Sequence, residues 1–311
     1  MNTTTLSFIN EQDNKTLEAV LRAQLPGQSW NQIRRIVEAR KVLLDGELCL
    51  DSAKRIHRGR KIELLEQSAP KPREPEPFPI RYLDAHIVVV EKPSGLSTVH
   101  HPAELEAKEQ PEPSLQELLP ALISRREGKA RGQLRVVQRL DKETSGLVVF
   151  ARTIQAEREL GQQFLMHTVK RRYFAIAPWF VKPQTISTWM VRDRGDGRRG
   201  NSPTEGVGKK AVTHVTVLEN VNGYSLISCV LETGRTHQIR IHLAGEGNPL
   251  CGEKVYNKRV NNVPLPDESG APRLALHALE LGFVHPETKQ DMFWEMPIPN
   301  DLQRFIERLK R

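Results

Sequence analysis

The most informative segment of the sequence runs Gln138-Arg139-Leu140-Asp141-Lys142-Glu143-Thr144-Ser145-Gly146-Leu147-Val148-Val149-Phe150-Ala151. Its order of residues predicts a polar loop, a tight turn and then a buried apolar strand. Gly146 permits the tight turn, and the hydroxyls of Thr144 and Ser145 can hydrogen-bond the loop. A carboxylate held on a loop at the mouth of a sheet, here Asp141, can act as a nucleophile or a base. A turn-forming aspartate without chemistry is the alternative at this point.

A second informative segment runs Thr233-Gly234-Arg235-Thr236-His237-Gln238-Ile239-Arg240-Ile241-His242-Leu243. Residues 237–243 alternate as in a strand, which predicts a core face made of His237, Ile239, Ile241 and Leu243. The opposite face would carry Gln238, Arg240 and His242, a polar row that suits a cleft or solvent. An arginine beside Asp141 would keep that carboxylate ionised and orient it. A structural salt bridge is the competing interpretation.

Composition limits the classes of protein. The chain has 311 residues, enough for two domains, and its formal net charge of +8 favours a polyanionic partner. The three cysteines, Cys49, Cys229 and Cys251, are widely spaced, which suits a reducing compartment. No apolar run approaches the roughly 20 residues of a membrane span, and residues 1–10 lack the pattern of a secretion signal. We therefore expect a cytoplasmic protein.

Other kinds of catalytic site are not indicated. His237 and His242 would lie on opposite faces of a strand, and no Cys/His cluster has ligand spacing, so we expect no metal. A glycoside hydrolase needs two carboxylates flanking the bond, and nothing marks Glu143 as the partner of Asp141. Glycine-rich loops that bind nucleotide phosphates are absent from the sequence.

A boundary between two domains lies in the segment QSAPKPREPEPFP, residues 67–79. Prolines at nearly alternate positions remove backbone donors and fix φ, so this segment should be extended. We predict a linker over residues 67–80, a small domain over residues 1–66 and a larger domain over residues 81–311.

In the small domain, apolar spacing predicts a helix over residues 16–25 and a second helix after Ser29, whose inward face would include Trp30. A hairpin turning at Asp45-Gly46 and a last strand over residues 62–65 follow. This order resembles the S-four-type (αL) RNA-binding domain. The resemblance implies RNA contacts by basic side chains, for which the candidates are Arg34, Arg35, Arg40 and Arg58. A solvated helix face is the alternative for any single arginine.

The larger domain is expected to be α+β, with a largely antiparallel mixed sheet and helices packed outside it. Strands are predicted over residues 87–90, 212–218, 225–231 and 237–243, and a helix from Ser114, with Glu117 completing a capping box. Residues 103–113 are charged and predict an exposed insertion.

Five segments of the larger domain, in order, are similar to the motifs of the RluA family of pseudouridine synthases. Two are the segments quoted above, similar to its His-Arg-Leu-Asp-x-x-Thr-Ser-Gly and Gly-Arg-Thr-His-Gln-Ile-Arg-x-His motifs. The others are residues 84–96, with Lys92-Pro93-Ser94-Gly95; residues 170–175, similar to Lys-x-Tyr-x-Ala; and residues 274–286, with Leu276-His277-Ala278 and His285-Pro286.

The resemblance implies roles for individual residues. Asp141 matches the catalytic aspartate, Tyr173 the tyrosine that stacks on the target base, and Arg240 the arginine that pairs with the aspartate. RNA contacts near this centre are expected from Arg139, Arg235 and Gln238. The chain departs from the signature at Gln138, where the family usually has histidine.

The resemblance further implies isomerisation of uridines in RNA, without a cofactor. Large-subunit ribosomal RNA is the first candidate substrate and transfer RNA the second. A non-catalytic RNA-binding or ribosome-assembly protein is the alternative from another class. The glycine-rich segment over residues 192–210 would be a mobile loop that clamps RNA, or a disordered insertion. We expect a monomer.

Overall fold

A computed structural model describes residues 4–69, 77–100, 112–128, 132–257, 259–260, 263–264 and 266–311. The chain divides into two compact units, Met1–Glu76 and Pro77–Arg311, which are described separately below. No helix in these ranges is both long and apolar enough to cross a membrane.

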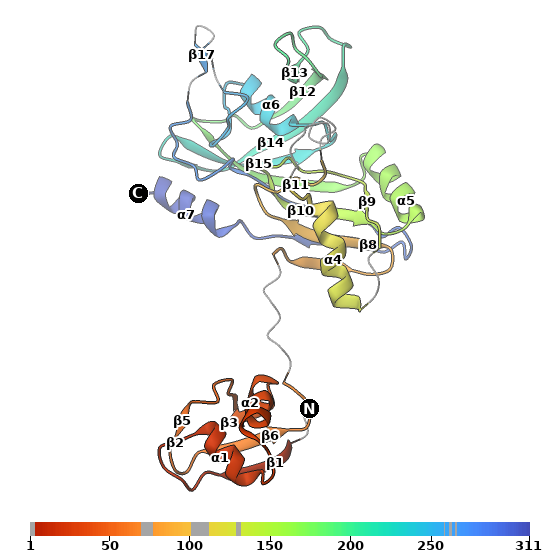
Figure 1. Ribbon diagram of the computed structural model, residues 1–311. Helices are drawn as coiled ribbons and strands as arrows, with labels where there is room; N and C mark the ends of the chain where they lie inside the picture. Colours follow the sequence, from red (N-terminus) through yellow and green to blue (C-terminus); the bar gives the residue numbers. More distant parts are fainter. Residues whose placement is uncertain are drawn as a thin grey trace. The chain divides into compact units, whose positions relative to one another are not determined.

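The first unit contains two helices and short strands (Figure 1). A four-stranded sheet has the order β1-β6-β3-β4, and β2 pairs separately with β5. The bounds are β1 Thr4–Ile9, β2 Lys15–Thr16, α1 Leu17–Gln24, α2 Trp30–Glu38, β3 Val42–Leu44, β4 Glu47–Leu48, β5 Arg55–Ile56 and β6 Lys61–Leu65. The strand β1 was not anticipated from the sequence.

Local sequence explains where these elements begin. The Ser29 hydroxyl accepts from the Gln32 amide while the Gln32 side chain accepts from the Ser29 amide, which is a capping box at the start of α2. The turn between β3 and β4 is the predicted one, with positive φ at both Asp45 and Gly46. Trp30, which was expected on the inward face of α2, is instead 41% exposed and lies under the guanidinium of Arg22.

The second unit is built on one large, mostly antiparallel sheet, with helices packed on it, as Figure 1 shows. Its strand order is β13-β12-β14-β15-β11-β18-β10-β8-β7, with β19 beside β18 and β9 beside β10. The elements are β7 Ile80–Leu83, β8 Ile87–Lys92, α4 Leu115–Glu127, β9 Arg135–Val136, β10 Ser145–Ala151, α5 Ile154–Leu165, β11 Lys170–Pro178, β12 Gln184–Val191, β13 Gly200–Asn201, β14 Lys209–Val221, β15 Tyr224–Leu231, α6 Gln238–Gly245, β16 Arg259–Val260, β17 Val263–Pro264, β18 Leu276–Val284, β19 Asp291–Glu295 and α7 Asn300–Leu309.

The central strands β10 and β18 run parallel, with Ser145 paired to His277 and Gly146 to Ala278. Gly146 of β10 faces Ala278 of β18 with φ of 128°, and a Cβ on Gly146 would lie 2.3 Å from the Ala278 carbonyl oxygen. Only glycine fits at this point. The contact fixes where the strand β10 begins, and therefore where the loop that carries Asp141 ends.

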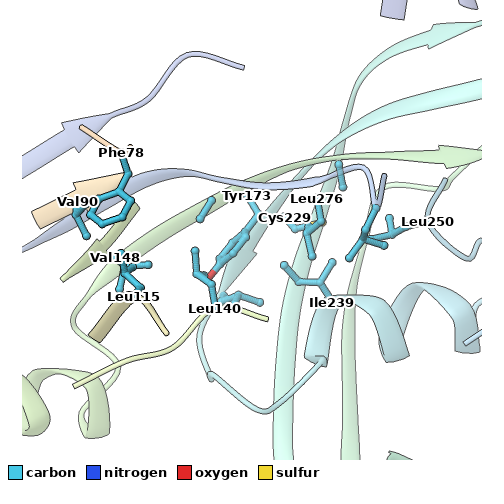
Figure 2. Packing of buried hydrophobic residues seen from close by; sticks show 14 of the residues in the cluster. Phe78, Val90, Leu115, Leu140, Val148, Tyr173, Cys229, Ile239, Leu250 and Leu276 are labelled. Atoms are coloured by element: carbon cyan, nitrogen blue, oxygen red, sulfur yellow. The ribbon is translucent and has the colours of Figure 1, made fainter. Parts of the chain in front are cut away.

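The main core lies on one face of this sheet. Figure 2 shows Phe78 beside Val90, with Leu115 of α4 and Val148 of β10 in the same cluster. Phe78 and Ile80 fall in the range expected for the linker, yet both pack in the core of the second unit. Residues 70–76 of that range, and residues 103–111 of the expected insertion, lie outside the described residues.

The prediction of a strand over residues 237–243 is wrong, because residues 238–245 form the helix α6. His237 takes a left-handed conformation, with φ of 58°, and the helix starts at the next residue. All side chains from Gln238 to Leu243 are buried. A short helix that is buried on every side has no polar, exposed face, so its sequence does not show the 3.6-residue period of a surface helix. The alternation of polar and apolar residues in this segment therefore did not indicate a strand.

The glycine-rich segment over residues 192–210 is partly a strand. Its residues 200–201 form β13 on the edge of the sheet, and the side chains of Thr188 and Asn201 hydrogen-bond across the pair. Arg198 donates to the backbone oxygen of Val255. The clamping role of this segment stays a prediction.

Candidate active site

A pocket of about 420 Å³ opens on the second unit. Four stretches that are distant in sequence supply most of its lining: residues 136–141 and 144 before β10, residues 164, 165 and 167 at the end of α5, residues 171 and 173 of β11, and residues 234–240 at the start of α6. The two segments that the sequence singled out therefore meet in one place.

Asp141 lies on the loop between β9 and β10, and its side chain is 16% exposed. The loop is fastened by the Thr98 hydroxyl, which donates to the Leu140 carbonyl oxygen and accepts from the Leu140 amide. The Thr144 amide donates to the Asp141 carbonyl oxygen and closes a turn. These bonds hold the backbone of Asp141 on both sides.

The Lys-Pro-Ser-Gly turn after β8 is hydrogen-bonded to the loop that carries Asp141. Lys92 is 1% exposed, and its ammonium group donates to the backbone oxygens of Pro93, Leu96 and Lys142. The Ser94 hydroxyl donates to the Glu143 carbonyl oxygen at 2.6 Å. Burial lowers the pKa of Lys92 to about 7, although the nearby carboxylates of Asp141 and Glu143 favour its charged form.

Neither hydroxyl at the end of the loop forms the hydrogen bond that was expected of it. The Ser145 hydroxyl lies 2.9 Å from Nδ1 of His277, across the contact between β10 and β18. The Thr144 hydroxyl has no hydrogen-bond partner in the described part of the chain, so its expected bond to the loop is not formed. Instead Thr144 lines the pocket.

Arg240 reaches Asp141 from the helix α6. Its Nη1 lies 3.4 Å from Oδ2 of Asp141, while Nε and Nη2 each donate to Glu253 at 2.7 Å. Burial opposes the charge of Arg240, but the bonds to Glu253 and Asp141 outweigh it and raise the Arg240 pKa. The bidentate pair with Glu253 fixes the guanidinium plane, leaving Nη1 directed at the Asp141 carboxylate.

Glu253 is a site residue that the sequence analysis missed. Its side chain is 1% exposed, and although burial opposes ionisation, Arg240 holds the pKa of Glu253 below its usual value. Glu253 follows α6 in a loop of unremarkable sequence, so only its position beneath Arg240 reveals it.

His237 also faces Asp141, whereas the alternation in sequence assigned it to the core. Its Nε2 lies 3.7 Å from Oδ1 of Asp141, and its Nδ1 lies 2.7 Å from the Tyr256 hydroxyl. Burial lowers the pKa of His237, more than the Asp141 carboxylate raises it. If the Tyr256 hydroxyl donates to Nδ1, the proton of the neutral imidazole is on Nε2, on the side of Asp141.

Tyr173 lies on β11, flanked by Cys229 of β15 and Ala278 of β18. It is 8% exposed and lines the pocket together with Asp141. Figure 2 shows its ring with the hydroxyl pointing toward Leu140, the neighbour of Asp141. Burial raises the pKa of Tyr173, so the phenol is neutral at pH 7.

The arginines proposed to contact RNA fall into two groups. Arg139 is exposed at the pocket, and Arg235 lines it while its Nε donates to the Lys210 carbonyl oxygen. The other four belong to the first unit: Arg35 and Arg58 are exposed, Arg34 is exposed and paired with Glu18 at 2.8 Å, and Arg40 is half-buried and donates to the Ala69 carbonyl oxygen.

Gln238 is a buried residue of the pocket lining, and its expected contact with RNA stays a prediction. It is 3% exposed, its side-chain oxygen accepts from the Thr233 hydroxyl and the Arg235 amide, and its nitrogen donates to the Val212 carbonyl oxygen and the Thr213 hydroxyl. Its hydrogen-bonding groups are thus occupied by β14 and the turn before α6.

Unsatisfied polar atoms gather at the pocket. Within the described residues, four buried side-chain nitrogen or oxygen atoms have no hydrogen-bond partner, and three of them belong to pocket residues: Gln138 Nε2, Thr144 Oγ1 and Arg171 Nε. Buried polar groups are rarely left unpaired, so these three atoms are available to hydrogen-bond water or a polar ligand in the pocket. No group of three or more His, Cys, Asp or Glu side chains in the same ranges could hold a metal.

Known proteins with similar sequences point in one direction. The chain is 37% identical over 303 residues to "Ribosomal large subunit pseudouridine synthase D" of Neisseria meningitidis serogroup A, covering 94% of this chain and 78% of that protein. It is 32% identical over 308 residues to the protein of the same name in Nitrosomonas europaea, covering 94% and 84%. It is also 32% identical over 323 residues to an uncharacterised RNA pseudouridine synthase of Bacillus subtilis, covering 100% and 99%.

The fold agrees with these similarities. The human protein "RNA Pseudouridylate Synthase Domain Containing 4" superimposes with a TM-score of 0.60 at 22% identity, covering 74% of this chain and 92% of the other. The family model described as RNA pseudouridylate synthase matches residues 86–245, a range that includes Asp141, Tyr173 and Arg240. The chain therefore belongs to the RluA-type family of pseudouridine synthases, isomerases that convert uridine to pseudouridine in RNA.

Proposed function

We propose that Asp141 is the catalytic carboxylate of this pseudouridine synthase, and that the pocket around it receives a single uridine extruded from RNA. The observation that carries the proposal is the charge of the pocket lining. Among the described residues that line it, Asp141 is the only acidic one, beside four arginines at positions 139, 171, 235 and 240. One carboxylate in a basic pocket suits an isomerase that acts on a polyanion, and it does not suit a glycosidase with two carboxylates.

Tyr173 is assigned to stacking on the extruded uracil, and Arg240 to pairing with Asp141. Extraction of a base from its stack costs a few kcal/mol, and an aromatic ring that restacks it returns about 1–3 kcal/mol. A pocket of about 420 Å³ lies within the usual size range of small-ligand sites. The contact of Arg240 with Asp141 at 3.4 Å favours the ionised carboxylate.

The reaction begins when Asp141 promotes cleavage of the bond between N1 of uracil and C1′ of ribose. Three routes fit one carboxylate: attack on C1′, attack on C6 of the base, or removal of the C2′ proton. The detached base rotates within the pocket and rejoins C1′ through C5, and the C5 proton is lost as N1 regains one. Atoms and electrons balance within the nucleotide, so the residues named above suffice and no cofactor is invoked.

The substrate that we propose is large-subunit ribosomal RNA, with transfer RNA as the second candidate. The names of the relatives from Neisseria and Nitrosomonas support the ribosomal choice. We assign residues 1–66 to an S-four-type RNA-binding domain and the second unit, Pro77–Arg311, to the catalytic domain. The linker expected over residues 67–80 ends earlier than expected, because Phe78 and Ile80 pack in the core of the second unit. The exposed Arg35 and Arg58 of the first unit support RNA binding there. We further propose a cytoplasmic monomer.

The experiment that tests this function is a map of pseudouridines in ribosomal and transfer RNA that lack the modification, before and after incubation with the protein. New pseudouridines in large-subunit ribosomal RNA are expected. New pseudouridines in transfer RNA alone would show that transfer RNA, the second candidate, is the substrate. RNA that is bound but never modified would instead favour the non-catalytic RNA-binding protein.

A further inference from the structure

Arg171 on β11 is a buried guanidinium that has no anionic partner among the described residues. It is 7% exposed, and its Nη2 donates to the Glu232 backbone oxygen at 3.0 Å. Its Nε has no partner, and no carboxylate of the described residues forms an ion pair with it. Arg240, which is 6% exposed in the same pocket, differs because Glu253 neutralises it.

The groups that surround the Arg171 guanidinium do not neutralise its charge. Gly234 lies so close that a Cβ there would be 2.6 Å from Nη1 of Arg171, and the Phe164 ring lies 5.5 Å from the guanidinium carbon. Burial lowers the pKa of Arg171, yet an arginine side chain still carries its proton in a protein. A buried cation is normally paired or bound to an anion, because it has lost the solvation of water.

Arg171 is also placed where the substrate would lie. It lines the pocket with Asp141, and it precedes Tyr173 by two residues on β11, which puts both side chains on the same side of the strand. A uridine within RNA brings one phosphodiester on each side of its ribose. The planar guanidinium fork matches the oxygens of such a group. A neutral uracil carbonyl would leave the charge of Arg171 uncompensated.

We propose that Arg171 binds one of the two phosphodiesters that flank the target uridine, and so fixes the ribose of the extruded nucleotide over Asp141. The proposal rests on the proposed function, since it takes the pocket as the uridine site. It assigns a separate task to each arginine of the interior: Arg240, neutralised by Glu253, orients the carboxylate, whereas Arg171 recognises the substrate backbone.

The test replaces the phosphate charge in the RNA and the guanidinium in the protein. Short RNAs that contain the mapped target uridine are prepared with a single neutral methylphosphonate on its 5′ or its 3′ side. Their affinities are measured with protein that carries Asp141→Asn, so that turnover does not alter the RNA. The same measurements are made with two double variants, in which the Asp141→Asn protein also carries Arg171→Met or, as a matched control, Arg172→Met. Arg172 is the next residue on β11, and it pairs with Glu280 outside the pocket.

A methylphosphonate at one of the two positions is expected to weaken binding about tenfold or more, the usual loss for a hydrogen bond between charged groups. With Arg171→Met the same replacement should have little effect, while Arg172→Met should retain the full loss. Arg171→Lys, which keeps the charge without the fork, should restore part of the discrimination. If Arg171→Met does not fold, the two methylphosphonates and Arg171→Lys still decide the matter.

Two results would overturn the proposed role of Arg171. In the first, a methylphosphonate weakens RNA binding equally in the Arg171→Met and Arg172→Met proteins. In the second, neither methylphosphonate weakens RNA binding by the parent protein. Because affinity is measured rather than turnover, that failure would not bear on isomerisation. Absence of new pseudouridines in the mapping experiment would instead overturn the proposed function itself.

Discussion

The ion pair between Arg240 and Glu253 makes a quantitative prediction about Glu253→Gln. The substitution keeps the shape of the side chain but removes the charge that neutralises a guanidinium with a side-chain exposure of 7%. Breaking a buried ion pair by neutralising one partner costs about 3–5 kcal/mol, because the other charge stays buried. For a unit of this size each kcal/mol lowers the melting temperature by about 2–4 °C, so a loss of about 6–20 °C is expected.

The effect of Glu253→Gln on the free energy of unfolding should depend on pH. Because Arg240 holds the pKa of Glu253 below its ordinary value of 4.5, the pair contributes stability that is fully present above the unfolded pKa. That contribution is lost as the pH falls through the lower folded pKa. The difference in unfolding free energy between the wild-type protein and Glu253→Gln should therefore be constant near neutral pH and shrink below pH 4.5.

Urea unfolding followed by circular dichroism at several pH values is the assay, with Glu280→Gln as the control. Glu280 pairs with Arg172, and the two side chains are 17% and 34% exposed, so its neutralisation should cost about 1 kcal/mol or less. A Glu253→Gln protein within about 1 kcal/mol of the wild type, or a difference that does not shrink in acid, would refute the reasoning about the buried pair.

Three further substitutions test the packing and the chemistry of the site. Gly146→Ala should destabilise the protein by at least about 2 kcal/mol in thermal melts, because the new Cβ would meet the Ala278 backbone. Gly161→Ala in α5 is the control. A Cβ there meets nothing within 4 Å, so this substitution should be neutral or stabilising. Tyr173→Leu should weaken RNA binding about five- to 150-fold through lost stacking, while Tyr173→Phe should keep the wild-type affinity in a filter-binding assay; equal affinities for the two variants would argue against stacking. Tyr256→Phe removes the hydroxyl that lies 2.7 Å from His237, and should lower kcat about two- to tenfold with little change in KM; unchanged kcat would mean that His237 does not act on Asp141.

The sequence was most informative where local chemistry determines structure. The capping box of Ser29 and Gln32 and the turn at Asp45 and Gly46 each depend on neighbours in the chain. Gly146, expected in a tight turn, lies instead in β10, where its contact with the distant Ala278 requires a glycine. The motif resemblance placed Asp141 and Arg240 together, and their side chains are 3.4 Å apart.

What escaped prediction depends on contacts between distant segments. Glu253 lies in a loop with no distinguishing motif, and it becomes part of the site only because α6 lays Arg240 over it. Gln238 looked like an exposed polar residue because α6 was taken for a strand, when its amide is in fact bonded to β14. For a short segment buried on every side, the alternation of residues does not distinguish the two structures.

Arg171 illustrates a further limit of sequence patterns. It lies between Lys170 and Arg172, and nothing in that basic run singles out the one cation that is buried. The lack of a carboxylate partner is a property of three-dimensional packing, and it becomes visible only when the side chains around Gly234 and Phe164 are in place.

The central claim is that the chemistry depends on the carboxylate of residue 141, and the most direct measurement is the single-turnover rate of pseudouridine formation by Asp141→Asn at saturating RNA. Glu143→Gln, two residues away on the same loop but outside the pocket lining, serves as the matched control. Asp141→Asn is expected to bind RNA as tightly as the wild type and to form no measurable pseudouridine, while Glu143→Gln turns over normally. Near wild-type turnover by Asp141→Asn would contradict the central claim.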